Sequence, residues 1–304
     1  SAPTTKYPNN PCVAIIALGG YAPDEAAFAN GITYLETQGC KVKNFYVPSE
    51  KFFRFGGTDE ARVKQLYAAI DDAEVDIVLM LRGGYGMSRL LPLLDFHRIA
   101  ASGKKFVGHS DFTAFQMGLL ASCGAMSFAG PMICDDFVRE DTSVFTMRQF
   151  WECLSSTSHS INVTRQGNPS VDVSGTLWGG NLAMLTHLVG TPYFPQIDHG
   201  ILFVEDINEH PYRIERMMLQ LLYAGVLARQ QAILFGDFSG YRLTDYDNGY
   251  DFSAMLTYLR SQVGVPILTG LPFGHTRDKA TLVVGCQAHL VSKESSFHLL
   301  MSGY

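Results

Sequence analysis

Residues 75–81 read Val-Asp-Ile-Val-Leu-Met-Leu, and residues 82–86 continue as Arg-Gly-Gly-Tyr-Gly. The first stretch is an almost continuous apolar run, which is typical of a strand buried on both faces of a sheet. Similar short runs alternate with helical patterns from residue 13 to residue 129. This alternation predicts a parallel sheet with helices on its faces, and therefore an α/β fold.

The other elements of this half follow from apolar runs, caps and helix-stop residues. We expect further strands at residues 13–17, 42–47, 105–108 and 126–129, and helices at residues 23–38, 60–70 and 112–121. Ligands bind beyond the carboxyl ends of the strands in an open α/β sheet, so the loops that follow these strands matter most for chemistry.

After about residue 155 the pattern changes to short β-forming segments between turn residues. We expect strands at residues 160–163, 171–175, 280–284, 288–291 and 297–301, with helices at residues 211–223 and 252–261. The polar segment at 164–170 is the best candidate linker. Because 304 residues are many for one hydrophobic core, we expect an α/β domain at residues 1–165 and a β-rich domain at residues 166–304.

Composition excludes several classes of protein. A net charge of −6, with no run of Lys or Arg, argues against general nucleic-acid binding. No apolar stretch approaches the roughly 20 residues of a membrane span. The chain starts without Met or a signal-type segment, so an exported form with a removed leader stays open. The cysteines are scattered without a Cys-x-x-Cys pair, which favours reduced structural thiols over a disulfide framework or a zinc site.

Two loops of the first half carry candidate chemistry. The glycines of residues 82–86 allow a sharp turn whose N–H groups face an anion, although a tight strand-to-helix turn explains them equally well. Ser110 lies in the second loop, Gly-His-Ser-Asp at residues 108–111, and a serine between a strand and a helix is presented at the sheet edge. The N–H of Asp111 would point into the same space and could stabilise an oxyanion.

Ser110 has an alternative role as a helix cap, which position alone favours. The hydrolase elbow Gly-x-Ser-x-Gly is also incomplete, because Phe112 stands at its last position. A serine nucleophile needs a base, and His275 is the histidine in a Gly/Pro-bounded loop, a common location for functional residues. An exposed loop histidine without a role is the alternative.

A carboxylate is needed to orient such a histidine. Glu205 and Asp206 end an apolar stretch that begins at Gly200. They also fit an acidic helix N-terminus, which the helix dipole stabilises. Together with Glu209 and His210 they could instead bind a metal ion, but His-Glu-x-x-His is absent.

Taken together, the segments resemble the LD-carboxypeptidase family of serine peptidases, which includes the microcin C immunity proteins. The resemblance covers most of the chain in the family's order and is strongest to the muramoyltetrapeptide carboxypeptidase branch. The matching blocks are RGGYG at 82–86, GHSD at 108–111, TLWGGNLAML at 176–185, EDINEHPYRIERMMLQL at 205–221 and LPFGHTRDKATLVVG at 271–285.

This resemblance implies a flavodoxin-like first domain that carries the nucleophile Ser110, and a second domain that supplies Glu205 and His275 across an interdomain cleft. It further implies that the N–H groups of Gly84 and Asp111 form the oxyanion hole. The implied substrate is a peptidoglycan-derived tetrapeptide or muropeptide. The implied reaction removes the terminal D-Ala by cleaving its bond to the third stem residue, an L-centred diamino acid, in cell-wall recycling or remodelling. No metal or organic cofactor is implied. A homodimer and a cytoplasmic location are the family's usual state, with a periplasmic location if a leader was removed.

Three residues are candidates for binding substrate. The guanidinium of Arg82 suits the D-Ala carboxylate, with a structural salt bridge as the alternative. Asn181 and Trp178 are expected to border the cleft, with core packing as the alternative for the Trp. The rival functions are a metal-dependent amidase, a non-catalytic wall-fragment binding module, and a hydrolase of acyl-sulfamoyl or aminoacyl-nucleotide antibiotics.

Overall fold

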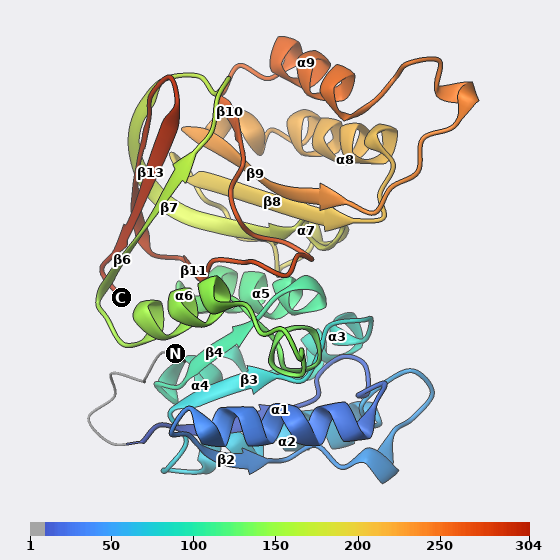
Figure 1. Ribbon diagram of the computed structural model, residues 1–304, viewed down its shortest axis with the longest axis vertical. Coiled ribbons are helices and arrows are strands. Elements are labelled where there is room, and N and C mark those ends of the chain that lie inside the picture. Colours follow the sequence, from blue (N-terminus) through green and yellow to red (C-terminus); the bar gives the residue numbers. More distant parts are fainter. Residues whose placement is uncertain (1–9) are drawn as a thin grey trace.

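The computed structural model describes residues 10–304, and two sheets run through this part of the chain. Figure 1 shows the first sheet in the lower half of the molecule and the second in the upper half, with α5 and β11 between them. All six cysteines are free thiols. Among residues 10–304, every helix falls short of the length and apolar character that a membrane span requires.

The first sheet has the strand order β11-β5-β4-β3-β1-β2. Strands β1 to β5 pair in parallel, and β11 pairs antiparallel to β5. The order 2-1-3-4-5 is the flavodoxin-like order, so the predicted fold of this part is confirmed. The bounds are β1 (Cys12–Ile16), β2 (Lys41–Asn44), β3 (Ile77–Met80), β4 (Lys105–Gly108), β5 (Ser127–Ala129) and β11 (Leu282–Val284).

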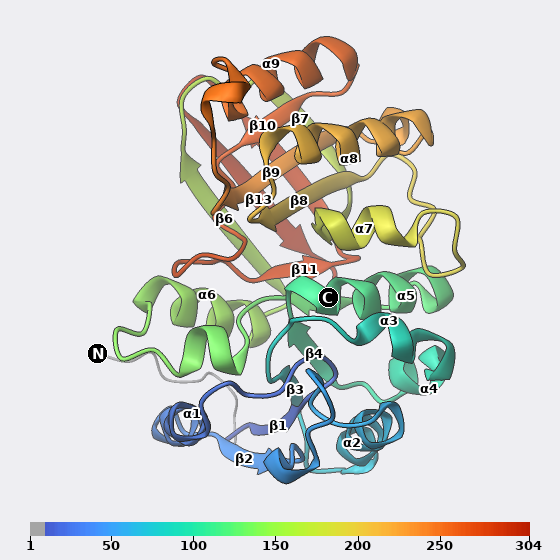
Figure 2. The ribbon, with the colours of Figure 1, turned by 90° about the vertical axis from the view of Figure 1, so that its right-hand side faces the viewer.

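Helices cover both faces of this sheet. Figure 2 shows α1 and α6 on one side, with α2, α4 and α5 on the other. All four residues of β3 are therefore buried, as their apolar run predicts. Side-chain oxygens of Asp24 and Thr58 cap α1 and α2. The bounds are α1 (Glu25–Thr37), α2 (Asp59–Asp71), α3 (Met87–Leu90), α4 (Phe96–Ala101), α5 (Thr113–Cys123) and α6 (Val144–Leu154).

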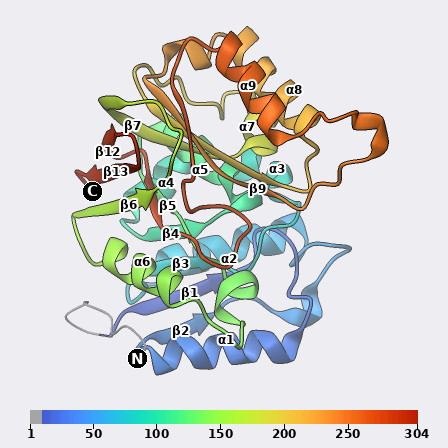
Figure 3. The same ribbon diagram turned by 45° about the horizontal axis from the view of Figure 1, so that its top comes forward.

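The second sheet has the order β10-β9-β8-β7-β12-β13-β6. Strands β7 to β10 are parallel, and the remaining pairs are antiparallel. Helices α8 and α9 lie side by side against the parallel part (Figure 3). The bounds are β6 (Ser158–Thr164), β7 (Val171–Asn181), β8 (Ile201–Ile207), β9 (Ala232–Ser239), β10 (Ile267–Thr269), β12 (Gln287–Ser292), β13 (Ser296–Ser302), α7 (Leu182–Leu188), α8 (Pro211–Tyr223) and α9 (Phe252–Gln262).

The second sheet and the path of the chain between the two sheets show features that the predicted division into two domains does not include. The second part is rich in strands as expected, but half of its sheet is parallel and helix-covered. The chain also crosses the predicted division at residue 165 in both directions, because β6 belongs to the second sheet and β11 to the first. No element was predicted at the positions of helices α3, α4, α6 and α7 or of strands β9 and β10.

Buried polar contacts join the two parts. Lys279, just before β11, forms an ion pair of 2.5 Å with Asp136, and both side chains are at most 2% exposed. The hydroxyl of Thr113 at the start of α5 accepts a hydrogen bond of 3.0 Å from N of Asn181 at the end of β7. These contacts fix the carboxyl ends of the two sets of parallel strands against one another.

Candidate active site

Ser110 lies on a strained turn between β4 and α5, where its φ is 63°. That left-handed conformation is rare for a residue with a side chain and is typical of a nucleophile elbow. Phe112 occupies the cap position of α5, and the Ser110 hydroxyl is hydrogen-bonded to a histidine. The helix-cap alternative is therefore not what this serine does.

His275 and Glu205 reach Ser110 from the second part of the chain. Nε2 of His275 lies 3.1 Å from Oγ of Ser110, and Nδ1 lies 2.8 Å from Oε2 of Glu205. Because a carboxylate only accepts, Nδ1 carries the proton and Nε2 is left to accept the serine hydrogen. This is the arrangement of a serine, a base and a carboxylate that orients the base.

The electrostatics around His275 suit a base. Burial disfavours its charged form, but the hydrogen bond and the charge of Glu205, helped by Asp135 and Asp206, outweigh burial and raise the pKa of His275 above its ordinary value. Glu205 itself is fully buried on β8. A raised pKa means that the imidazolium formed during proton transfer is stabilised where it stands.

The glycine loop after β3 passes directly over the serine. A Cβ on Gly83 would lie 2.9 Å from both Cβ and Oγ of Ser110, and 3.5 Å from N of Asp111. The Gly83 carbonyl accepts a hydrogen bond of 2.8 Å from N of Gly20, and Gly84 has a φ of 76°. Peptide groups of this loop therefore lie beside the peptide group of Asp111. The oxyanion roles of Gly84 and Asp111 stay a prediction.

The side chain of Asp111 links the two loops. Its Oδ2 accepts a hydrogen bond of 2.8 Å from N of Met87, the first residue of α3. Burial raises the pKa of Asp111 to about 6, against the hydrogen bond from Met87 and the charge of Arg62. Only the backbone of Asp111 has a role predicted from the sequence, because nothing local to residues 108–111 indicates a partner in the preceding loop.

Asn181 lies behind Glu205. Its Nδ2 donates to Oε1 of Glu205 (3.3 Å) and to Oδ1 of Asp206 (3.1 Å), and its Oδ1 caps α7. Burial, followed by the charge of Glu205, raises the pKa of Asp206 to about 6. The amide nitrogen of Asn181 thus donates to two carboxylates. Asn181 lies behind the catalytic carboxylate, whereas the sequence predicts it at the border of the cleft.

The other two predicted substrate-binding residues have different surroundings. Trp178 is 1% exposed, and its Nε1 donates to Oε1 of Gln230 at 2.8 Å, so it packs in the core as its alternative role requires. Arg82 is half-buried beside Gly20, and within residues 10–304 it forms none of the ion pairs. Its guanidinium is therefore available to a ligand.

The rival metal set does not assemble. Glu209 pairs with Arg213 at 2.6 Å, and His210 pairs with Asp247 at 2.8 Å, while Glu205 faces His275. In the part of the chain that the structure describes, no three His, Cys, Asp or Glu side chains are grouped to hold a metal ion. These pairs stabilise the start of α8 and connect it to the loop between β9 and α9.

His109 is a buried neighbour that sequence analysis leaves without a role. Its Nδ1 donates to the Gly130 carbonyl at 2.8 Å, and its ring lies edge-on to that of His275 at 5.5 Å. Burial, reinforced by the charges of Lys279 and His275, holds the pKa of His109 well below its ordinary value. The neutral ring of His109 thus packs against His275 and does not compete with it for the Ser110 proton.

Family models match both parts of the chain. Residues 13–130 match the LD-carboxypeptidase N-terminal domain, and residues 174–290 match the LD-carboxypeptidase C-terminal domain. The chain belongs to the LD-carboxypeptidase family. This membership accounts for the shared order of the blocks that surround Ser110, Glu205 and His275.

Relatives of this LD-carboxypeptidase family member match over most of its length. A probable murein peptide carboxypeptidase of Bacillus subtilis is 29% identical over 279 residues, which cover 90% of this chain and 87% of the relative. A crystal structure of muramoyltetrapeptide carboxypeptidase from Oxalobacter formigenes is 52% identical, with a TM-score of 0.93 and coverage of 96% of this chain and 99% of that one. The microcin C7 self-immunity protein of Escherichia coli is 26% identical over 293 residues, covering 85% and 83%.

Proposed function

We propose that this protein is a serine LD-carboxypeptidase that removes the terminal D-Ala from peptidoglycan tetrapeptide stems. The observation that carries the proposal is the hydrogen-bonded series Ser110–His275–Glu205, with distances of 3.1 and 2.8 Å. The choice of substrate is supported by the 52% identity to a muramoyltetrapeptide carboxypeptidase.

The first half of the proposed reaction acylates the serine. His275 takes the Ser110 proton at Nε2 while Oγ attacks the carbonyl carbon that precedes D-Ala. Glu205 keeps the other imidazole nitrogen protonated and stabilises the imidazolium. N–H groups of Gly84 and Asp111 receive the developing oxyanion, and losing one such donor typically costs ~2.7–4 kcal/mol.

The second half releases the products. His275 returns the proton to the nitrogen of D-Ala, the amide bond breaks, and D-Ala leaves as the free amino acid. Water then attacks the ester on Ser110 with His275 again as the base, which frees a tripeptide and restores the serine. Arg82, on the loop that crosses the serine, is the proposed partner of the D-Ala carboxylate.

A second candidate function is hydrolysis of an acyl-sulfamoyl nucleotide, favoured by the 26% identity to the microcin C7 self-immunity protein. The test incubates the wild-type protein separately with a tetrapeptide ending in D-Ala, the same peptide ending in L-Ala, and an acyl-sulfamoyl adenosine. We expect D-Ala release from the first alone. Turnover of the nucleotide without D-Ala release would replace the proposal with the second candidate.

A further inference from the structure

A cavity of about 600 Å³ opens beside the loop that carries His275. It lies at the carboxyl ends of β9 and β10, which is where α/β sheets receive ligands. Phe273 and Thr276, on either side of His275, both line it. The loop that carries His275 therefore forms part of the cavity wall, although neither His275 nor Ser110 lines the cavity itself.

Asp237 places a carboxylate in this cavity. A Cβ on Gly274 would lie 3.1 Å from Cβ of Asp237 and 3.4 Å from Cβ of Glu205, so Gly274 lies close to both acids. The Ser239 hydroxyl donates to Oδ2 of Asp237 at 2.6 Å, and N of Asp237 donates to the Phe273 carbonyl at 2.8 Å. Ser239 thus holds the carboxylate, and the Phe273 carbonyl holds the backbone that carries it.

The Asp237 carboxylate has no cationic partner within the part of the chain that the structure describes. Asp237 itself is half-buried. Two cationic side chains also line the cavity, and both have other partners: Arg277 pairs with Asp141 and Asp278, and Nε of Arg165 donates to the Thr269 hydroxyl at 3.2 Å. A partly desolvated carboxylate without a counter-charge favours a cationic ligand.

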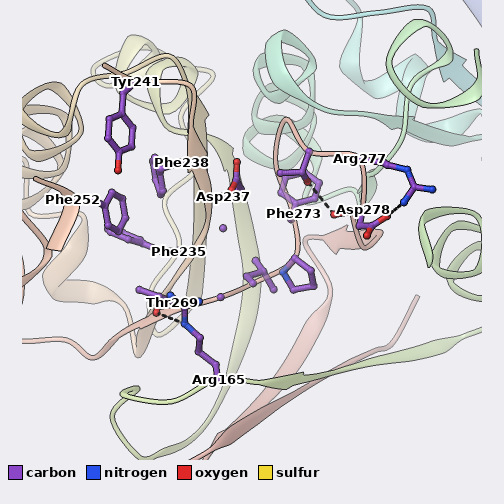
Figure 4. Close-up of a pocket in the computed structure, with 15 residues that line it drawn as sticks. Arg165, Phe235, Asp237, Phe238, Tyr241, Phe252, Thr269, Phe273, Arg277 and Asp278 are labelled. Atoms are coloured by element: carbon purple, nitrogen blue, oxygen red, sulfur yellow. Dashed lines mark hydrogen bonds and ion pairs between the residues drawn. The ribbon is translucent and has the colours of Figure 1, made fainter. Parts of the chain in front are cut away.

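The other walls are aromatic. Figure 4 shows Asp237 between a group formed by Phe235, Phe238, Tyr241 and Phe252 on one side and Phe273 on the other. Such walls suit a chain of methylene groups. Together with the carboxylate they describe a receptor for an alkyl chain that ends in an ammonium group.

We propose that this cavity binds the side chain of the stem's third residue, a diamino acid, and that Asp237 pairs with the ammonium group at the end of that side chain. The inference rests on the proposed function, because that residue supplies the carbonyl that Ser110 attacks. Its side chain would then extend from Ser110 along the loop that carries His275, since Phe273 and Thr276 of this loop line the cavity that holds Asp237.

The test measures binding separately from catalysis. Tetrapeptide stems with lysine, Nε-acetyl-lysine or norleucine as third residue are titrated into the Ser110→Ala variant by calorimetry. We expect the lysine stem to bind about tenfold tighter than the other two, since charged hydrogen bonds are worth that much. In Ser110→Ala/Asp237→Asn, which keeps an acceptor for Ser239, the three affinities should converge. The matched control Ser110→Ala/Asp172→Asn removes an exposed acid on β7 and should keep the preference.

Equal binding of the three stems, or a lysine preference that survives Asp237→Asn, overturns the assignment of the cavity. D-Ala release by the wild-type protein is measured in parallel. A lysine preference without any D-Ala release contradicts the proposed function and leaves the cavity's ligand standing. Serine-dependent D-Ala release at equal rates from the three stems, without a binding preference, supports the proposed function and contradicts the assignment of the cavity. Failure of all three stems to bind contradicts both.

Discussion

Oγ of Ser110 lies 3.1 Å from Nε2 of His275, although 165 positions separate the two residues in the chain. Ser110 follows β4 of the first sheet. His275 lies in the loop before β11, which also belongs to the first sheet, and most strands of the second sheet come between the two residues in the chain. The contact therefore depends on both parts being folded and docked. This dependence makes the docking contacts as testable as the reacting groups.

Gly83→Ala should inactivate the protein with little loss of stability. The new methyl group would lie 2.9 Å from the serine Oγ and displace it, and displacement of a reacting group by about 1 Å can cost ~100-fold in rate. We expect kcat/KM for D-Ala release to fall by at least that factor. Gly264→Ala, in open space, is the matched control and should be fully active. An active Gly83→Ala variant would mean that the loop does not cover the nucleophile.

Glu205→Gln should change both the rate and its pH dependence. A neutral amide cannot hold the required tautomer, and such a change in a related triad costs ~10⁴-fold in kcat. In the wild type, activity should fall as pH drops through the raised pKa of His275, because only the neutral imidazole accepts the proton. Without Glu205, burial dominates and lowers that pKa, so the residual activity should persist to lower pH. A pH profile of kcat/KM measures both effects, and an acid limb at unchanged pH would contradict the role of Glu205.

Asp111→Ala should lower kcat by roughly tenfold or more, because it cuts the tie to N of Met87 between the two loops and leaves that N–H unpaired. The backbone N–H of residue 111 is unaffected. Asp111→Asn keeps an acceptor at this position and should restore much of the rate. Steady-state kinetics distinguish this from a stability effect, since KM should change little. An Asp111→Ala variant as active as the wild type would contradict this role of the carboxylate.

Lys279→Met should destabilise the protein by ~3–5 kcal/mol, because it leaves Asp136 buried without its partner. Burial already raises the pKa of Asp136, with Lys279 opposing the shift. A raised pKa in the folded state means that stability is lost as pH rises, so the deficit should be larger at pH 8 than at pH 5. Urea unfolding at both pH values tests this. Arg98→Met, which breaks an exposed pair with Asp71, should cost less than ~1 kcal/mol.

Sequence patterns predict the first sheet well because each buried strand is a compact apolar run. The segment at 105–108 and the helix at 211–223 are predicted with the bounds that the structure gives. Strand β9 has an apolar run of the same kind at 232–235, a signal that sequence analysis leaves unused. The exchange of β6 and β11 between sheets has no local signal, because pairing partners lie far away in the chain.

The residues of the site, like the elements of the fold, include some that local sequence patterns indicate and others that they do not. Ser110 can be proposed from its place between a strand and a helix, but local patterns favour a cap, and only the resemblance to a family links it to Glu205 and His275. The tie from Asp111 to Met87, the support of Glu205 by Asn181 and the placement of Asp237 depend on contacts between loops. Trp178 illustrates the converse, since a conspicuous aromatic residue in a matching block proves to be core.

The most direct test of the account is D-Ala release from a tetrapeptide stem by the wild-type protein and by Ser110→Ala, followed by mass spectrometry. Circular dichroism and thermal unfolding would show that both proteins are folded. We predict conversion of tetrapeptide to tripeptide plus D-Ala by the wild type and a loss of at least ~10³-fold in Ser110→Ala. A folded Ser110→Ala variant that releases D-Ala at the wild-type rate would contradict the assignment of Ser110 as the nucleophile.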